Sequence, residues 1–198
     1  MATVVVPFRG SDPKRRLAPV AELDRVRLAE AMLADVLAAA GGIGRIFVVA
    51  PDTPTLPEGV QHVADPRRGQ GAAVRDALDA AVSAGAPAPY LVVNSDLPCA
   101  TPRDLLALAG ALPHGGLAVV AAADGTTNAL ALGDAELFEP LYGPGSAARY
   151  AALAPAVIVD APNLVDDVDT LADLTRLVAR LGPRTRALYD ALRLGRAA

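Results

Sequence analysis

Short apolar runs alternate with longer segments of helical periodicity along this chain. Val4-Val5-Val6 and the run 46–50 predict buried strands, because apolar and β-branched residues follow one another there without polar interruption. Between these runs, apolar side chains recur at helical spacing from Val26 to Ala40, and Gly41-Gly42 ends the predicted helix. A strand, a helix and a second strand within about fifty residues form a βαβ unit, which predicts a parallel sheet.

The same alternation continues to the C-terminus. It predicts strands at 60–63, from Tyr90 toward Asp96, at 117–122 and at 157–159, and helices over 73–82 and from 101, 170 and about 184. The first of these helices is expected to turn its apolar residues, Val82 among them, toward the core. Thr101 and Thr170 fit helix N-caps, since each has an aspartate three residues later. The apolar segment 129–132 receives no element.

Composition sets the broad class. The chain has 198 residues, 53% apolar and 20% charged, which predicts one globular domain spanning residues 1–198. The formal net charge of −4 argues against a nucleic-acid partner, which would need clustered lysines and arginines. No apolar run is long enough to cross a membrane, and no signal peptide precedes the first strand. We therefore expect a cytoplasmic protein that binds no membrane.

The single cysteine, Cys99, excludes an internal disulfide, which agrees with a cytoplasmic location. Cys99 does not make a zinc site with His62 and His114. A catalytic thiol is not favoured, because no histidine lies near Cys99 in the sequence and a buried, inert cysteine is the usual case.

Four polar loops each follow an apolar strand. They cover residues 7–16, 65–71, 94–98 and 124–128. Loops that follow parallel strands share the carboxyl edge of the sheet, where open α/β folds bind their ligands. We therefore expect the four loops to converge on one crevice.

Asp96 and Asp169 are the candidate metal ligands. Asp96 follows the central strand, and we expect Asp169 to end a strand as well. Two such carboxylates could hold one or two Mg²⁺ ions against a nucleotide phosphate. Asp167 is a weaker candidate in the same run. The alternative for both aspartates is a capping role, although Thr170 suits the cap after Asp169 better.

A basic loop and two glycine-containing segments offer groups that suit anions. The loop holds Arg9, Lys14, Arg15 and Arg16 before a helix, an arrangement that suits a polyphosphate but is equally typical of a solvated loop. It lacks the spacing of a P-loop. Segments 125–128 and 143–146 combine glycine backbone with hydroxyls and suit a phosphate or carboxylate, unless each is only a turn.

Several of these motifs also occur together in one known family. In chain order they are Val6-Pro7-Phe8-Arg9, Lys14-Arg15-Arg16-Leu17, Asn94-Ser95-Asp96-Leu97-Pro98, Gly125-Thr126-Thr127-Asn128-Ala129-Leu130, Tyr142-Gly143-Pro144-Gly145-Ser146 and Asp167-Val168-Asp169-Thr170. Over essentially its whole length the chain resembles the 2-phospho-L-lactate guanylyltransferases, in particular their bacterial phosphoenolpyruvate guanylyltransferase branch.

The resemblance implies a fold and a reaction. The fold would be α/β, a single-domain Rossmann-like nucleotidyltransferase (GT-A-like) fold with a mostly parallel mixed sheet flanked by helices. The reaction would transfer GMP from GTP to the phosphate of phosphoenolpyruvate in coenzyme F(420) biosynthesis, and the product would pass to the next enzyme of that pathway. The alternatives are transfer to 2-phospho-L-lactate or another phosphorylated small acid, transfer to a molybdopterin or sugar phosphate, and nucleotide binding without catalysis.

The resemblance also implies roles for individual residues. Catalysis would rest on Asp96, Asp169 and Lys14, with one or two Mg²⁺ ions on the two aspartates. The phosphorylated acid would lie on Thr127, Gly143 and Ser146, and the nucleotide on Arg9, Lys14, Arg16, Gly69 and Gly71. The chain departs from the family at Gly69-Gln70-Gly71, where relatives usually have Gly-Leu-Asn, and the missing asparagine bears on base preference.

Overall fold

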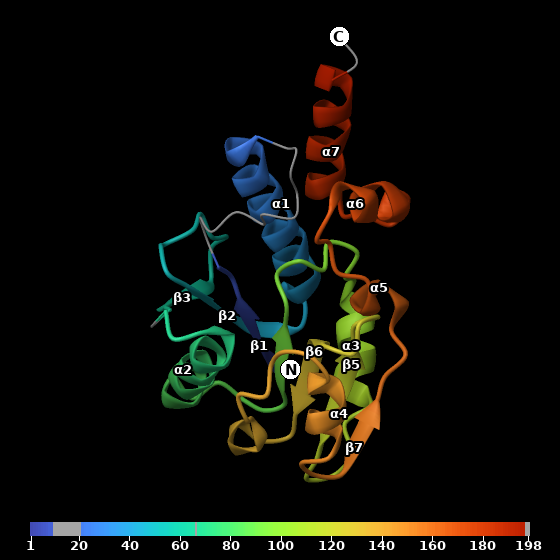
Figure 1. The fold of residues 1–198 in the computed structure, drawn as a ribbon. Coiled ribbons are helices and arrows are strands. Elements are labelled where there is room, and N and C mark those ends of the chain that lie inside the picture. The colour runs from blue at the N-terminus through green and yellow to red at the C-terminus, as the bar shows by residue number, and fades with distance from the viewer. Residues whose placement is uncertain (10–20, 66, 197–198) are drawn as a thin grey trace.

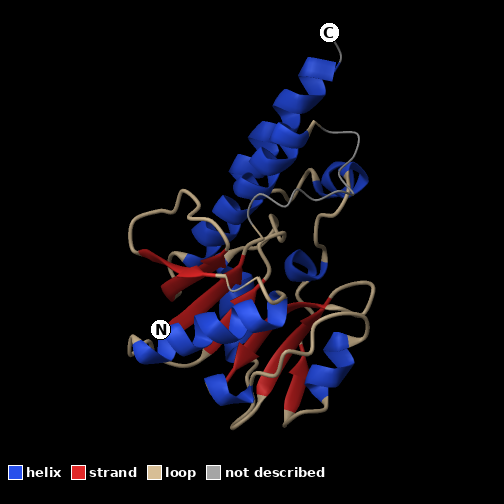
Figure 2. Cartoon of the chain, turned by 60° about the vertical axis from the view of Figure 1, so that its left-hand side comes forward, coloured by secondary structure: helices blue, strands red, loops and turns tan. Residues whose placement is uncertain are grey.

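The computed structural model describes residues 1–9, 21–65 and 67–196 and shows one sheet covered by helices on both faces (Figures 1 and 2). The strands are β1 Ala2–Pro7, β2 Gly44–Ala50, β3 Val60–Ala64, β4 Tyr90–Val93, β5 Leu117–Ala121, β6 Thr127–Leu132 and β7 Ala156–Ile158. The helices are α1 Glu22–Ala40, α2 Gln70–Ser83, α3 Pro102–Gly110, α4 Ser146–Ala151, α5 Pro162–Val165, α6 Leu171–Leu177 and α7 Pro183–Arg196, with a short 3₁₀ helix η2 at Ala135–Leu137. No helix among the described residues is both long and apolar enough to span a membrane.

The seven strands are ordered β3-β2-β1-β4-β6-β5-β7. Strand β6 runs antiparallel to both neighbours, β4 and β5, and all other pairs are parallel. This confirms the mostly parallel mixed sheet. Because β5 is antiparallel to β6, it points the same way as β4, and the loop after β5 returns to the carboxyl edge of β4. The segment 129–132, to which the apolar pattern assigned no element, is therefore the inner part of the strand that reverses the sheet.

Alternate residues of the strands feed two apolar layers. In β1, Val4 and Val6 pack on the side of α1, α3 and α5, whereas Val5 packs on the side of α2 and α4. The expectation that Val82 faces the core is wrong, since its side chain is 50% exposed. On a helix of 3.6 residues per turn, Val82 lies about 110° from the centre of the buried stripe that ends at Ala81.

A third apolar cluster joins the C-terminal helices to α1. It contains Leu28, Met32, Cys99, Val168, Leu174, Leu177 and Tyr189. The carboxylate of Asp35, in α1, accepts hydrogen bonds from the backbone amides of Arg184 and Thr185 at 3.1 and 2.9 Å, and so caps the start of α7. This packing places the segment before α6 against the loop that follows β4.

Candidate active site

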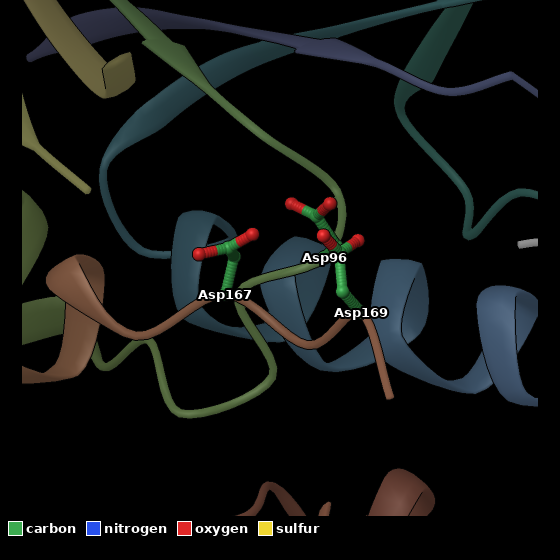
Figure 3. Close-up of side chains that lie close together, drawn as sticks. All are labelled: Asp96, Asp167 and Asp169. Atoms are coloured by element: carbon green, nitrogen blue, oxygen red, sulfur yellow. The ribbon is translucent and has the colours of Figure 1, made fainter. Parts of the chain in front are cut away.

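Three aspartates meet at the carboxyl end of β4. One carboxylate oxygen from each of Asp96, Asp167 and Asp169 lies within 4.8 Å of the others, and all three residues are half-buried. Figure 3 shows the side chains directed toward one another, Asp96 from the loop after β4 and the other two from the segment between α5 and α6. We call these three residues the acid cluster.

The prediction that Asp169 ends a strand is wrong. Strand β7 ends at Ile158, and the helix α5 intervenes before the acidic segment. Asp96 does follow the central strand, since it lies three residues beyond the end of β4. Thr170 forms a capping box with Asp173 at the start of α6, so the alternative of Asp169 as that cap does not hold.

Asp167 joins the cluster because of the residue beside it. Val168 is fully buried in the third apolar cluster, and its backbone N–H donates to the carbonyl of Asp96 at 3.0 Å. Successive side chains of an extended segment point to opposite sides, so burial of Val168 turns Asp167 and Asp169 together toward Asp96. The spacing of two acids around one apolar residue was the sequence signal for Asp167.

Two arginines lower the pKa of Asp166, the residue directly before Asp167 of the acid cluster. Partial burial raises the pKa of Asp166, but hydrogen bonds from Arg176 and Arg180 outweigh it and hold that pKa below its usual value. Asp166 is therefore ionised throughout the neutral range.

A cleft of about 790 Å³ opens beside the acid cluster's loop. Its described lining residues are Arg9, Arg68, Gly69, Gln70, Gly71, Ala72, Arg75, Asp76, Asn94, Thr126, Thr127, Pro140, Tyr142 and Gly143. All four polar loops contribute, which confirms that they converge. Of the predicted binding residues, Arg9, Gly69, Gly71, Thr127 and Gly143 line the cleft. Lys14 and Arg16 lie outside the described residues.

Hydrogen bonds connect the walls of the cleft to one another. The amide of Gln70 donates to Asn94 Oδ1 at 2.9 Å, and Asn94 Nδ2 donates to the carbonyl of Thr127 at 3.2 Å. The hydroxyls of Thr127 and Ser146 are 2.9 Å apart. Ser146 is fully buried and is not among the described residues that line the cleft, so its hydroxyl reaches the site through Thr127.

Gly71 marks a close approach between α2 and the segment 138–145. A Cβ at this position would lie 2.5 Å from Pro140 Cβ, too close for two carbon atoms. Arg75 reinforces the contact by donating to the carbonyls of Ala135 and Phe138. The facing loop therefore occupies the space that a side chain at position 71 would need.

The segment 138–145 is also held from α4. Tyr150 donates to the carbonyl of Glu139 at 2.6 Å, and Arg149 donates to the carbonyls of Leu141 and Pro144 at 2.7 and 2.6 Å. Burial, followed by the charge of Tyr150, raises the pKa of Tyr142 well above its ordinary value. Tyr142, which lines the cleft, therefore stays protonated well into the alkaline range.

A second cavity of about 870 Å³ is larger but lies elsewhere, between α1 and the loop 51–59. None of the predicted site residues is among its described lining residues. The chemistry of the acid cluster and the convergence of the loops favour the smaller cleft as the functional one.

The chain is similar to known nucleotidyltransferases in sequence and in fold. Residues 17–164 match the family model of the MobA-like NTP transferase domain. The chain is 37% identical over 186 residues to a phosphoenolpyruvate guanylyltransferase of Nocardia farcinica, covering 83% of this chain and 79% of the relative. It is 33% identical to a 2-phospho-L-lactate guanylyltransferase of Natrialba magadii, covering 88% and 82% of the two chains. It is also 33% identical to a 3-phospho-D-glycerate guanylyltransferase of Phenylobacterium zucineum, covering 97% and 95%.

Solved structures share the fold at lower identity. A Desulfovibrio desulfuricans protein described as a nucleotide-diphospho-sugar transferase superposes with a TM-score of 0.73 at 19% identity, over 100% of this chain and 96% of that one. A Mycobacterium tuberculosis protein solved in complex with manganese gives a TM-score of 0.56 at 21% identity, over 90% and 97%. These likenesses show a nucleotidyltransferase fold. The three relatives at 33–37% identity show the family within that fold. The chain belongs to the guanylyltransferase family that these relatives represent, within the MobA-like nucleotidyltransferases.

Proposed function

We propose that this chain transfers GMP from GTP to the phosphate of a phosphorylated small acid, with phosphoenolpyruvate as the preferred acceptor. The acid cluster beside a cleft lined by four loops is the observation that carries the proposal. Residues 1–198 would form one nucleotidyltransferase domain. The guanylylated acid would then pass to the next enzyme of coenzyme F(420) synthesis in the cytoplasm.

The donor set of the acid cluster fits a magnesium or manganese ion. Three carboxylates supply only oxygen, the ligand type that both ions prefer. Because all three residues are only half-buried, phosphate oxygens and water could complete the coordination of the ion. A divalent cation held by Asp96, Asp167 and Asp169 would neutralise charge on the nucleotide's α-phosphate. We propose Mg²⁺ as the physiological ion.

The remaining groups would bring two anions together. A phosphate monoester has a second pKa of about 6, so the acceptor is already a nucleophile at neutral pH and needs no side chain as a base. Arg9, which lines the cleft, would face the triphosphate, where its charge offsets the repulsion between the substrates. We propose the same role for Lys14 and Arg16, which lie outside the described residues. Thr127 and Gly143 would hold the acid, with Ser146 positioning the hydroxyl of Thr127.

The identity of the acceptor acid needs an argument of its own. The three relatives carry the names of three different phosphorylated acids, so family membership leaves the choice open. The matching enzyme of Nocardia farcinica, named for phosphoenolpyruvate, favours that acid. Phosphoenolpyruvate and 2-phospho-L-lactate differ by saturation of one bond, a change that a pocket discriminates weakly.

The test is pyrophosphate release from GTP and Mg²⁺ with each of the three acids in turn and in competition. We expect the highest kcat/KM with phosphoenolpyruvate; a higher value with either other acid would reassign the acceptor. No release with any acid would support nucleotide binding without transfer. Asp96→Asn and Asp169→Asn should each abolish release while the protein stays folded, whereas Asp79→Asn, an exposed aspartate of α2, should retain it.

A further inference from the structure

Two arginines hold the segment that carries Asp167 and Asp169. Arg176, in α6, donates to Asp166 Oδ1 at 2.6 Å and to Asp173 Oδ1 at 3.2 Å. Arg180, beyond α6, donates to Asp166 Oδ2 at 2.5 Å. Each carboxylate oxygen of Asp166 therefore has its own guanidinium, directly before the first acid of this segment. We call Arg176 and Arg180 the arginine pair.

Arg180 also connects this point to the preceding helices. It donates to the carbonyl of Pro162 at 3.1 Å and to Asn163 Oδ1 at 3.2 Å. Asn163 in turn donates to Asp104, the partner of Thr101 in the α3 capping box, at 3.2 Å. The hydrogen bonds thus run from α3 through α5 to the acidic segment.

Anchors and acids alternate along residues 166–170. Asp166 is bound by the arginine pair, Val168 is buried and bonded to the backbone of Asp96, and Thr170 caps α6. The two acids of the cluster stand between these three anchors. Loss of any one anchor would free the backbone beside Asp167 or Asp169, whose carboxylates must point toward Asp96 to share a metal ion.

We propose that Arg176 and Arg180 are positioning residues for the acid cluster. By holding Asp166 they set the direction in which Asp167 and Asp169 project, and so they set the affinity of the cluster for a divalent cation. This inference rests on the metal role assigned to the cluster under the proposed function.

Two general magnitudes separate positioning from simple stabilisation. The side chains of Arg176 and Arg180 are 51% and 39% exposed, and ion pairs at such positions contribute little to folding stability. Removal of groups that orient metal ligands, in contrast, typically weakens metal binding by about 10–100-fold. The effect should therefore appear in metal affinity far more than in the melting temperature.

The charge of the arginine pair and its positioning role have opposite effects on metal affinity, so the two can be told apart. The arginine pair is positively charged and lies beside the cluster, so its charge alone repels a cation. Neutral replacements would tighten metal binding if charge were the only effect, and would weaken it if positioning dominates.

The experiment is titration of the purified, ligand-free protein with Mn²⁺, following the free-ion signal by electron paramagnetic resonance. The variants are Arg176→Gln, Arg180→Gln and the double replacement, with melting temperature and circular dichroism measured in parallel. We expect the dissociation constant of the double variant to rise by about tenfold or more with little change in melting temperature. Should the double variant fail to fold, the single variants carry the same comparison.

Arg186→Gln is the matched control. Arg186 is 45% exposed, pairs with Asp190 at 2.7 Å and donates to the carbonyl of Val178. Within the part of the chain that the structure describes, it forms no hydrogen bond or ion pair with residues 166–170. It should bind Mn²⁺ as the wild type does. Unchanged or tighter binding in the arginine-pair variants, with Asp169→Asn still losing it, would overturn this inference alone. Wild-type binding in Asp169→Asn would refute the metal role and this inference with it.

Discussion

Replacement of Gly71 by alanine tests whether contact between α2 and the segment 138–145 shapes the cleft. The new Cβ would lie 2.5 Å from Pro140 Cβ and 3.0 Å from Pro140 Cα, so one of the two backbones must move. Pro140 is exposed, but the carbonyls on either side of it accept hydrogen bonds from Tyr150 and Arg149 at 2.6 and 2.7 Å. The loop cannot shift without straining these bonds.

Two effects on stability oppose each other in this variant. Alanine in place of glycine in a helix raises the unfolding free energy by up to about 1 kcal/mol. Overpacking costs about 1–3 kcal/mol. We expect a net loss of about 1 kcal/mol, which lowers the melting temperature of a chain of this size by about 2–4 °C. The same segment brings Tyr142 and Gly143 to the cleft. If the loop moves and about 1 kcal/mol of binding free energy is lost, the KM of the phosphorylated acid should rise about fivefold.

Thermal unfolding and steady-state kinetics with each substrate varied in turn provide the assay. The matched control is Gly110→Ala, at the end of α3, where a Cβ would meet nothing within 4 Å. That variant should keep or slightly raise the melting temperature and keep both KM values. A Gly71→Ala protein that behaves like Gly110→Ala would refute the argument that Pro140 occupies the side-chain space.

Three further predictions concern stability, the acid site and pH. Asp35→Ala should lower the unfolding free energy by about 1–2 kcal/mol, since the carboxylate caps two amides at the start of α7; an unchanged melting temperature would contradict this. Ser146→Ala should raise the KM of the phosphorylated acid more than that of GTP, because Ser146 bonds the hydroxyl of Thr127; the reverse would mean that the two substrate sites are exchanged. Burial raises the pKa of Tyr150 from 10.0 to about 12, so the unfolding free energy should fall as pH rises from 10 toward 12, the unfolded state losing its proton first. Urea unfolding at stepped pH measures that slope, which should be smaller in Tyr150→Phe.

Local chemistry accounts for much of what the sequence predicted correctly. The N-caps Thr101 and Thr170 need only a partner three residues away, and both form capping boxes. The buried runs of β1, β2 and β4 are recognisable because strands covered on both faces are apolar throughout. Strand β6 was missed because its residues, Thr127 to Leu132, include two alanines and no valine or isoleucine.

The sequence by itself determined that polar loops follow the strands of a parallel sheet, and hence that the loop carrying Asp96 reaches a shared crevice, which Asn94 of that loop lines. That inference holds because the apolar runs and the helical segments between them are local patterns, and a strand–helix–strand connection makes the two strands parallel. Only the tertiary structure decided that Asp167 completes the acid cluster, that Asp169 follows a helix and not a strand, and that Pro140 fills the space beside Gly71. Each of these depends on contact between segments far apart in the chain. For the acid cluster, packing of α6 and α7 on α1 sets the position of residues 166–170. Local patterns carry no information about such contacts, so the pairing of acids could be expected while its geometry could not.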